Sequence, residues 1–257
     1  MSWDARFFIA IFPDGEWCKV HAFSGGKRPG FHCTSALEAL DGEPQHVAMI
    51  GRRGRVERRD DGASFDGNVV RATGVEASIS VSGGDAADAR DRFFWCRVPR
   101  VLSYWSATGR ARVTIDGVTR DAFGVLEHAW GGETRLDVAA LAPSRWQWDV
   151  LHLGEDRFFA GLALHGLGAH GAARLEDGGR GIARVNRLRI DMKEPGKTWS
   201  GVLVTRAGTL RYDAHAVTPV LPEVPDGGFV GFEWDGTLRG KRVSGSGFSE
   251  FRARIKA

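Results

Sequence analysis

Short segments in which apolar and polar residues alternate recur along the whole chain. The clearest runs from Val75 to Val81, where Val, Ala, Ile and Val alternate with Glu, Ser and Ser. A period of two places successive side chains on opposite faces of a strand, so this segment predicts a β-strand with one wet face. The same criteria predict strands near residues 6–12, 17–23, 68–73, 93–98, 111–115, 118–123, 146–153, 157–165, 182–190, 198–205, 209–216, 229–234 and 248–255.

Glycine separates these segments, commonly as Asp-Gly or Gly-Gly. The chain contains 35 glycines in 257 residues, close to twice the usual ~7%. Asp116-Gly117 lies between two alternating segments and predicts a tight hairpin. Helical periodicity is limited to Thr34–Leu40 and Asp85–Asp91, each long enough for only a turn or two. The pattern predicts an all-β protein with very little helix.

This many short strands favours closed or strongly curved antiparallel sheets, because a long open sheet must curl or split to hide its edges. We therefore expect two β-barrel-like halves. The polar segment Ser106–Gly109 follows the apolar run VLSYW at residues 101–105. We place the boundary there, which predicts an N-terminal β domain over residues 1–105 and a C-terminal β domain over residues 106–257.

Composition and charge exclude several classes of protein. The chain is 42% hydrophobic and 26% charged, which excludes disordered, collagen-like and coiled-coil proteins. No apolar stretch approaches the ~18 residues of a membrane helix, and no signal-peptide pattern is present, so we expect no transmembrane segment. Cys18, Cys33 and Cys96 form no Cys-x-x-Cys pair, which argues against a disulfide framework and favours a cytoplasmic location.

The net charge of +3 comes from acids interleaved with arginines, so we expect no nucleic-acid partner. One basic cluster over Gly51–Asp61 contains Arg52, Arg53, Arg55, Arg58 and Arg59. These side chains either bind an acidic partner or form a solvated turn between two strands. We favour the solvated turn, because Glu57, Asp60 and Asp61 of the same segment offset part of its positive charge.

The common motifs of cofactor and metal binding are missing. Gly166, Gly168 and Gly171 have Gly-x-Gly-x-x-Gly spacing, but the residues that follow are too few for the helix that a dinucleotide site requires. His165 and His170 are weak evidence for a metal site, because no carboxylate accompanies them at a suitable spacing. We expect no cofactor and no metal.

The candidate chemistry lies in FGVLEHAWGG, residues 123–132. In an extended strand His128 and Trp130 project to one face and Glu127 to the other, and Trp146 and Trp148 likewise share a face of a later strand. A titratable imidazole therefore lies among indole rings. The alternative is that these tryptophans are core residues and the histidine is hydrogen-bonded and inert.

Two glutamates stand in apolar surroundings, Glu250 in the C-terminal GSGFSEF and Glu233 in FVGFEW. A carboxyl group in such surroundings needs a partner; otherwise its pKa rises and it becomes a proton donor. The alternative is an ion pair with Arg252 or another arginine.

Three segments together resemble the AttH-like, carotenoid-hydratase-like family of double-lipocalin (calycin-like) proteins: ARVTIDGVTRDAFGVLEHAWGG, RWQWDVLHLGEDRFFAG and the terminal GSGFSEF. In that family a DG hairpin leads into Asp-His-x-Trp-Gly, followed by a Trp-x-Trp strand, an acidic turn and a terminal Gly-x-Gly-x-x-Glu. Glu127 stands where the family has Asp. The resemblance covers roughly Ala111–Gly161 and the last fifteen residues, and the first half matches only in being β-rich.

The resemblance implies two joined lipocalin-like antiparallel β-barrels or strongly curved sheets. It also implies a cofactor-independent lyase (hydratase) or isomerase/cyclase, including pericyclases, acting on a hydrophobic polyene, isoprenoid or polyketide-like molecule. We hypothesise that His128 donates a proton, with its acidity set by Glu127 or Glu250. An apolar pocket would be lined by Trp130, Trp146, Trp148, Trp105, Tyr104 and Glu233. The indoles of Trp130, Trp146 and Trp148 would stabilise a carbocation there.

Other functions fit the same residues. A lipocalin-like barrel can carry a lipophilic ligand without chemistry. A pericyclic reaction needs only a shaped cavity, with no acid. A third interpretation is that the tryptophans plug a domain interface in a protein that binds only other proteins. An apolar cavity next to His128 would separate the first two functions from the last.

Overall fold

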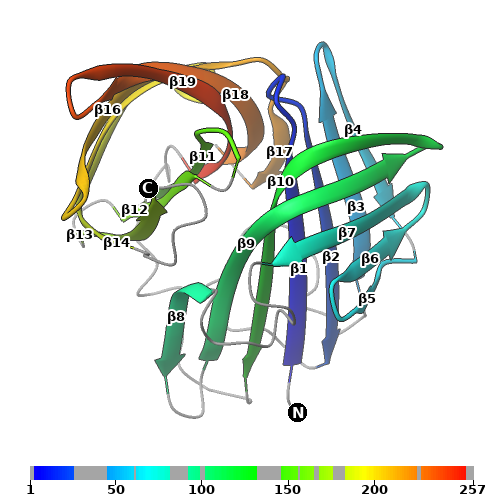
Figure 1. Cartoon of the computed structure of the whole chain (residues 1–257). Helices are drawn as coiled ribbons and strands as arrows, with labels where there is room; N and C mark the ends of the chain where they lie inside the picture. The colour runs from blue at the N-terminus through cyan, green and yellow to red at the C-terminus, as the bar shows by residue number, and fades with distance from the viewer. Residues whose placement is uncertain are drawn as a thin grey trace. The chain divides into compact units, whose positions relative to one another are not determined.

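The computed structural model describes residues 3–25, 45–60, 62–81, 92–98, 102–131, 146–155, 157–164, 168–175, 183–224 and 227–252. Every regular element in these ranges is a β-strand (Figure 1), which confirms the all-β prediction. The two helical turns expected at residues 34–40 and 85–91 lie outside the described residues.

The chain divides into two compact units. Unit 1 consists of Met1–Ala10, Cys18–Ile50 and Glu57–Ala142, and unit 2 consists of Ile11–Trp17, Gly51–Val56 and Pro143–Ala257. The predicted boundary at Ser106–Gly109 falls inside a single continuous strand, and the main division lies instead between Ala142 and Pro143. The polar segment is not a linker, because the side chains of Ser106 and Thr108 are buried.

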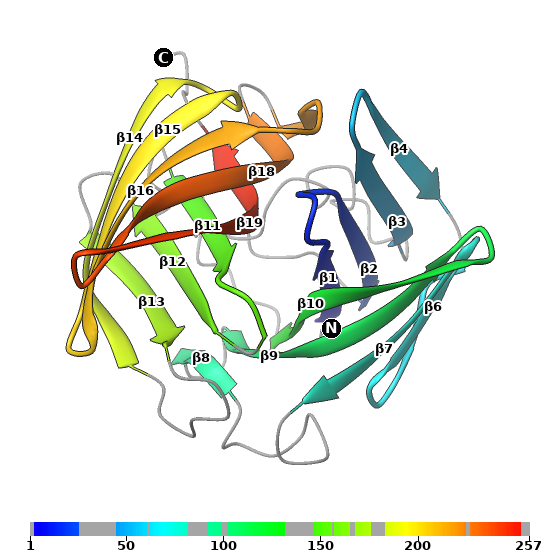
Figure 2. The same cartoon turned by 45° about the horizontal axis from the view of Figure 1, so that its top comes forward.

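The first sheet is open and strongly curved (Figure 2), with strand order β4-β3-β2-β1-β10-β9-β7-β6-β5 and β8 paired with β9. Its strands are β1 (Trp3–Ile11), β2 (Trp17–Gly25), β3 (Gln45–Arg52), β4 (Arg55–Asp60), β5 (Ser64–Asp66), β6 (Val69–Ala72), β7 (Val75–Val81), β8 (Arg92–Val98), β9 (Leu102–Ile115) and β10 (Val118–Gly131).

The longest hairpin of this sheet joins β9 to β10 through the predicted Asp116-Gly117 turn. Both residues have positive φ, 52° and 83°, as a two-residue type I′ turn requires. The Asp116 carboxylate accepts two hydrogen bonds of 2.8 Å from the Arg59 guanidinium of β4. Gly74 leaves room for this pair, since a Cβ there would lie 2.2 Å from Arg59 Nη1.

The arginine cluster lies at the turn between β3 and β4, as expected for an arginine-rich turn between strands. Carboxylates pair with several of its members: Arg58 contacts Asp60 at 2.7 Å, and Arg59 contacts both Glu57 and Asp116. These pairs favour a solvated edge over a site for an acidic partner.

The second sheet closes into a barrel. Its strand order is β16-β15-β14-β13-β12-β11-β19-β18-β17, and an additional β16–β18 pairing closes eight strands into a ring (Figure 2). Strand β17 lies outside the ring and pairs with β18. The strands are β11 (Trp146–His152), β12 (Phe158–Leu164), β13 (Gly168–Arg174), β14 (Ala183–Glu194), β15 (Thr198–Thr205), β16 (Gly208–Ala216), β17 (Leu221–Val224), β18 (Gly227–Leu238) and β19 (Lys241–Arg252).

The glycine-rich segment, for which the sequence analysis rejected a dinucleotide-binding role, contributes a strand to this barrel. Residues 168–174 form β13, which pairs with β12 and β14. Gly171 lies so close to β12 that a Cβ would be 2.3 Å from the Ala160 carbonyl oxygen. This glycine therefore serves strand packing, whereas Gly166 and His165 lie outside the described residues.

Candidate functional site

His128 lies on β10 and pairs with a carboxylate that the sequence analysis did not identify. Its Nε2 is 2.6 Å from Oδ2 of Asp4 on the neighbouring strand β1. The imidazole is half-buried, with 22% of its side chain exposed. Burial raises the pKa of the Asp4 carboxyl, but the hydrogen bond to His128 and the charges of His128 and Arg6 together outweigh burial, and the net pKa is lowered. The lowered pKa of Asp4 places an ionised carboxylate within hydrogen-bond distance of the imidazole at neutral pH.

Two indole rings of unit 1 surround this imidazole. The Trp130 ring lies 4.5 Å from it between centroids, tilted by 35°, and the Trp105 ring meets it edge-on at 6.0 Å. Trp105 lies directly opposite His128 in the β9–β10 register and is buried, whereas Trp130 is 37% exposed. Trp105 and Trp130 are thus the ring neighbours of His128 described in unit 1, and their role in binding a substrate stays a prediction.

The Asp4–His128 pair can be tested without a substrate. In the His128→Asn variant the pKa of Asp4 should rise toward its ordinary value, because the charge of His128 is lost while burial and the interactions with Arg6 remain. In the native protein the lowered pKa means that pairing stabilises the fold above the ordinary pKa of Asp, ~3.9, and that this contribution is lost as the pH falls through the lowered value. Carboxyl ¹³C NMR titration measures the change, and His215→Asn is the matched control.

Glu127 does not accompany His128, because the two side chains project from opposite faces of β10. The Glu127 carboxylate is buried and accepts a hydrogen bond of 3.1 Å from Ser106 Oγ, its register partner on β9. Within unit 1 the carboxylate partner of His128 is therefore Asp4. The role of Glu127 as a catalytic residue stays a prediction.

The other predicted site residues belong to unit 2. Trp148 on β11 lies opposite Glu250 on β19, which in turn lies opposite Phe229 on β18. Glu250 is 2% exposed and Trp148 is half-buried. The Glu250 carboxylate thus lies between two aromatic residues across neighbouring strands, and its role as a catalytic residue stays a prediction. The side chains of Tyr104 and Trp146 lie outside the described part, although their backbones belong to β9 and β11.

Glu233 forms an ion pair on the surface of unit 2. Its Oε1 accepts a hydrogen bond from Arg53, and its Oε2 lies 3.4 Å from Nε2 of His215. Arg53 also donates to the carbonyl oxygen of Asp14. This arrangement agrees with the alternative in which the carboxylate pairs with an arginine, and it supplies no apolar lining.

A buried carboxylate that was not singled out occupies the interior of the barrel. Asp149 accepts hydrogen bonds from four side chains at 2.6–2.9 Å: Tyr212, Ser249, Gln147 and Trp199. Burial raises the pKa of Asp149 against the opposing effect of these bonds, and burial with the charge of Asp149 raises the pKa of Tyr212 well above its ordinary value. The aspartate appears in the sequence within Trp-Gln-Trp-Asp, but only the fold places its partners around it.

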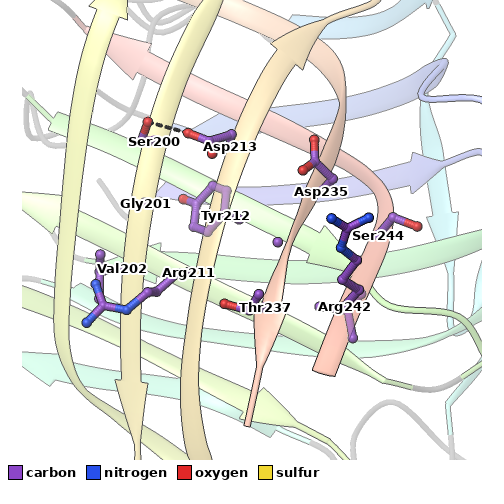
Figure 3. A pocket seen from close by; sticks show the side chains of 12 residues that line it. Ser200, Gly201, Val202, Arg211, Tyr212, Asp213, Asp235, Thr237, Arg242 and Ser244 are labelled. Atoms are coloured by element: carbon purple, nitrogen blue, oxygen red, sulfur yellow. Dashed lines mark hydrogen bonds between the residues drawn. The ribbon is translucent and has the colours of Figure 1, made fainter. Parts of the chain in front are cut away.

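One depression of about 800 Å³ opens on the barrel, across β15, β16, β18 and β19. Figure 3 shows its predominantly polar side chains, among them Ser200 and Asp213, which share a hydrogen bond of 2.6 Å. Arg211, Asp235 and Arg242 also line it, and none of the predicted site residues does. It is not the apolar Trp-lined pocket expected from the sequence.

The described residues include no helix of the length and apolarity that a membrane crossing requires. They also contain no group of three or more His, Cys, Asp or Glu side chains arranged to hold a metal ion.

Comparisons with known proteins identify the fold. No protein-family model matches the sequence, and no curated protein sequence matches it. Kievitone hydratase from Nectria haematococca matches in structure with a TM-score of 0.54 and 12% identity, over 98% of this chain and 88% of that chain. A Nitrosomonas europaea protein assigned as AttH matches with a TM-score of 0.53 and 10% identity, over 99% and 92%.

The structure of CghA with Sch210972 matches with a TM-score of 0.55 and 12% identity, over 98% of this chain and 88% of that chain. At such low identity these similarities concern the fold, not the activity. They agree with the family resemblance seen in the sequence and extend it to the N-terminal half. The chain therefore has the double-lipocalin fold of the kievitone hydratase, AttH and CghA structures.

Proposed function

We propose that the protein is a cofactor-independent enzyme that transforms a hydrophobic polyene, isoprenoid or polyketide-like molecule by acid-assisted hydration, isomerisation or cyclisation. The observation that carries this proposal is the Asp4–His128 pair of 2.6 Å, flanked by the indoles of Trp105 and Trp130. The fold shared with a kievitone hydratase supports it.

In the proposed reaction the protonated imidazole of His128 gives its proton to one alkene carbon. The alkene π electrons form the new C–H bond, and the other carbon becomes a carbocation. Asp4 holds the imidazole in position, and the exposed face of Trp130 stabilises the cation, an interaction worth ~2 kcal/mol or more when desolvated. Water then adds and loses a proton, or a neighbouring C–H loses a proton, or a second alkene attacks and the new carbocation in turn loses a proton. In each case the imidazole, neutral after its donation, takes up the released proton. These three outcomes are hydration, isomerisation and cyclisation.

His128→Ala should lower turnover by roughly 10²–10⁴-fold, the usual contribution of a general acid. Purified protein is incubated in D₂O with a panel of polyenes and isoprenoids, and products are separated by mass, because protonation of an alkene adds deuterium to carbon. Circular dichroism checks that the variant is folded. Turnover by His128→Ala equal to that of the native protein would remove His128 from the mechanism.

The same experiment tests the other predicted acids and the rival functions. Loss of turnover in Glu127→Gln or Glu250→Gln, with His128→Ala active, would transfer the acid role to that carboxyl. A product without deuterium that forms equally well in all three variants indicates a pericyclic reaction. Binding of the panel compounds without any product identifies a carrier.

The interior of the unit 2 barrel argues against a carrier that uses this barrel as its cavity. Its described inward side chains include Trp199, Tyr212, Phe232 and Trp234, which form one buried cluster, and the Trp199 and Phe232 rings meet edge-on at 4.8 Å. Close-packed aromatic side chains leave no room for a ligand there.

A further inference from the structure

The depression on the unit 2 barrel contains charged side chains that the proposed reaction does not use. It crosses four strands that pair side by side, β15, β16, β18 and β19. Its volume of about 800 Å³ is in the usual range of sites for small molecules, ~300–1,000 Å³. Most such sites are apolar, whereas this one is lined largely by polar side chains (Figure 3). Its ligand is therefore expected to be polar as well.

The carboxylates of the depression belong to one row across the strands. Asp213 on β16 lies directly opposite Asp235 on β18. Ser200 and Ser244 continue the row on β15 and β19. These side chains point away from the barrel interior, because the alternate residue Tyr212 is buried inside it. Two carboxylates on opposing residues repel each other, and within the described part of the chain no cation pairs with either of them.

A row of arginines runs beside the acidic row, two residues away along the strands. Arg211 on β16 and Arg242 on β19 lie on either side of Thr237 on β18, and Val202 completes the row on β15. Among the described residues neither guanidinium has a carboxylate partner, and Figure 3 marks no hydrogen bond on either. The two rows are roughly 7 Å apart, at ~3.4 Å per residue.

Opposite charges in the depression are thus separated rather than paired. Arg211 and Asp213 stand two residues apart on one face of β16 and form no ion pair with each other. Arg58 and Asp60 have the same spacing on β4, and there the two side chains meet at 2.7 Å. The spacing therefore permits an ion pair that β16 does not make, so both of its charges stay open to a partner from outside.

We propose that this depression binds a small zwitterion, a molecule whose ammonium and carboxylate groups are about one row spacing apart. The ammonium group lies between Asp213 and Asp235, where it removes their mutual repulsion. The carboxylate lies over Thr237 and accepts charge-assisted hydrogen bonds from Arg211 and Arg242, whose long side chains reach it from both sides. Because all four charged side chains are exposed to water, each ion pair contributes little, and the expected dissociation constant is about millimolar.

Three six-carbon probes test the two rows. 6-Aminohexanoate carries both charges, hexanoate carries only the carboxylate, and hexylamine carries only the ammonium group. Binding to the full chain is measured at low ionic strength by ¹H–¹⁵N NMR titration, which also identifies the backbone amides that shift. 6-Aminohexanoate should bind about fivefold more tightly than either other probe, the upper value for an exposed ion pair. It should shift the amides of Gly201, Gly236 and Thr237, which line the depression.

Two variants assign one charge of the ligand to each row. Asp235→Asn should weaken binding of 6-aminohexanoate and of hexylamine roughly threefold to fivefold and change binding of hexanoate less than about twofold. Arg242→Gln should weaken 6-aminohexanoate and hexanoate to the same extent and leave hexylamine within about twofold. The matched controls are Asp66→Asn and Arg184→Gln, at exposed positions outside the depression, and they should leave all three affinities unchanged.

The proposal is overturned if 6-aminohexanoate binds no more tightly than hexanoate and hexylamine. It is also overturned if the shifted amides lie outside β15, β16, β18 and β19, or if either variant weakens all three probes equally. Circular dichroism checks the fold, and Asp213→Asn and Arg211→Gln replace a variant that does not fold. None of these residues takes part in the reaction proposed for Asp4 and His128, so the binding test stands or falls separately from turnover.

Discussion

Replacing Trp17 with alanine is expected to lower the free energy of unfolding by about 3–5 kcal/mol, the usual cost of truncating a fully buried Trp. Trp17 is completely buried in unit 2. Its indole N–H donates to Thr218 Oγ1 at 3.1 Å, and its ring meets Phe248 and Phe229 edge-on at 5.1 Å and 6.1 Å. Urea unfolding followed by circular dichroism measures the loss.

Two glycines make the slot for this ring. A Cβ at Gly51 or Gly231 would lie 2.0 Å or 2.6 Å from indole atoms. Gly51→Ala should therefore destabilise the native protein and cost less in the Trp17→Ala background, because the three atoms nearest to its Cβ all belong to the indole ring. Trp130→Ala is the matched control, because that indole is 37% exposed. Equal losses for Trp17→Ala and Trp130→Ala would show that Trp17 does not anchor the unit.

The period-two pattern identified the strands whose two faces differ. Val75–Val81 and Thr198–Thr205 were predicted with the bounds that the structure shows, and in both strands buried residues alternate with more exposed ones. The pattern missed β4, whose sequence RVERRD is polar on both faces, and β13, whose sequence GAHGAAR lacks β-branched residues. A strand that is stabilised mainly by backbone pairing, or that consists of small residues, shows little alternation of apolar and polar side chains, so the sequence pattern does not reveal it.

The site was predictable only where its residues are close in sequence. Alternation along β10 places His128 and Trp130 on one face and Glu127 on the other, and the DG turn fixes which residues of β9 lie opposite. Asp4 is separated from His128 by 124 residues, and only the order of the strands in the sheet brings them together. No local pattern contains that order. The sequence analysis therefore proposed Glu127, which is adjacent to His128 in the sequence, and Glu250, which has apolar neighbours in the sequence, as partners of the imidazole.

Asp149→Ala is expected to cost about 4 kcal/mol or more. It removes a shared acceptor of four buried donors, each of which costs ~1–3 kcal/mol when left unsatisfied: Trp199, Tyr212, Ser249 and Gln147. The hydroxyl groups of Tyr212 and Ser249 can rotate toward other acceptors, whereas the direction of the Trp199 N–H is fixed by its ring. The barrel that surrounds this N–H is closed, so it has no bulk water to bind instead. Urea unfolding at neutral pH measures the change.

Asp149→Asn should lower the free energy of unfolding far less than Asp149→Ala does. Because asparagine fills the same space as aspartate, this variant changes the hydrogen-bond network without creating a cavity. Gln147 Oε1 makes no hydrogen bond within the described residues, so a flipped Gln147 amide accepts from the new side-chain nitrogen at position 149, and the new side-chain oxygen still accepts from Trp199 and Tyr212. Because burial raises the pKa of Asp149, the native protein loses this group's contribution to stability as the pH rises from ~4 through the raised value. The asparagine variant does not titrate, so its stability relative to the native protein should increase over that range. A constant difference in the free energy of unfolding between pH 4 and pH 8 would contradict a raised pKa of Asp149.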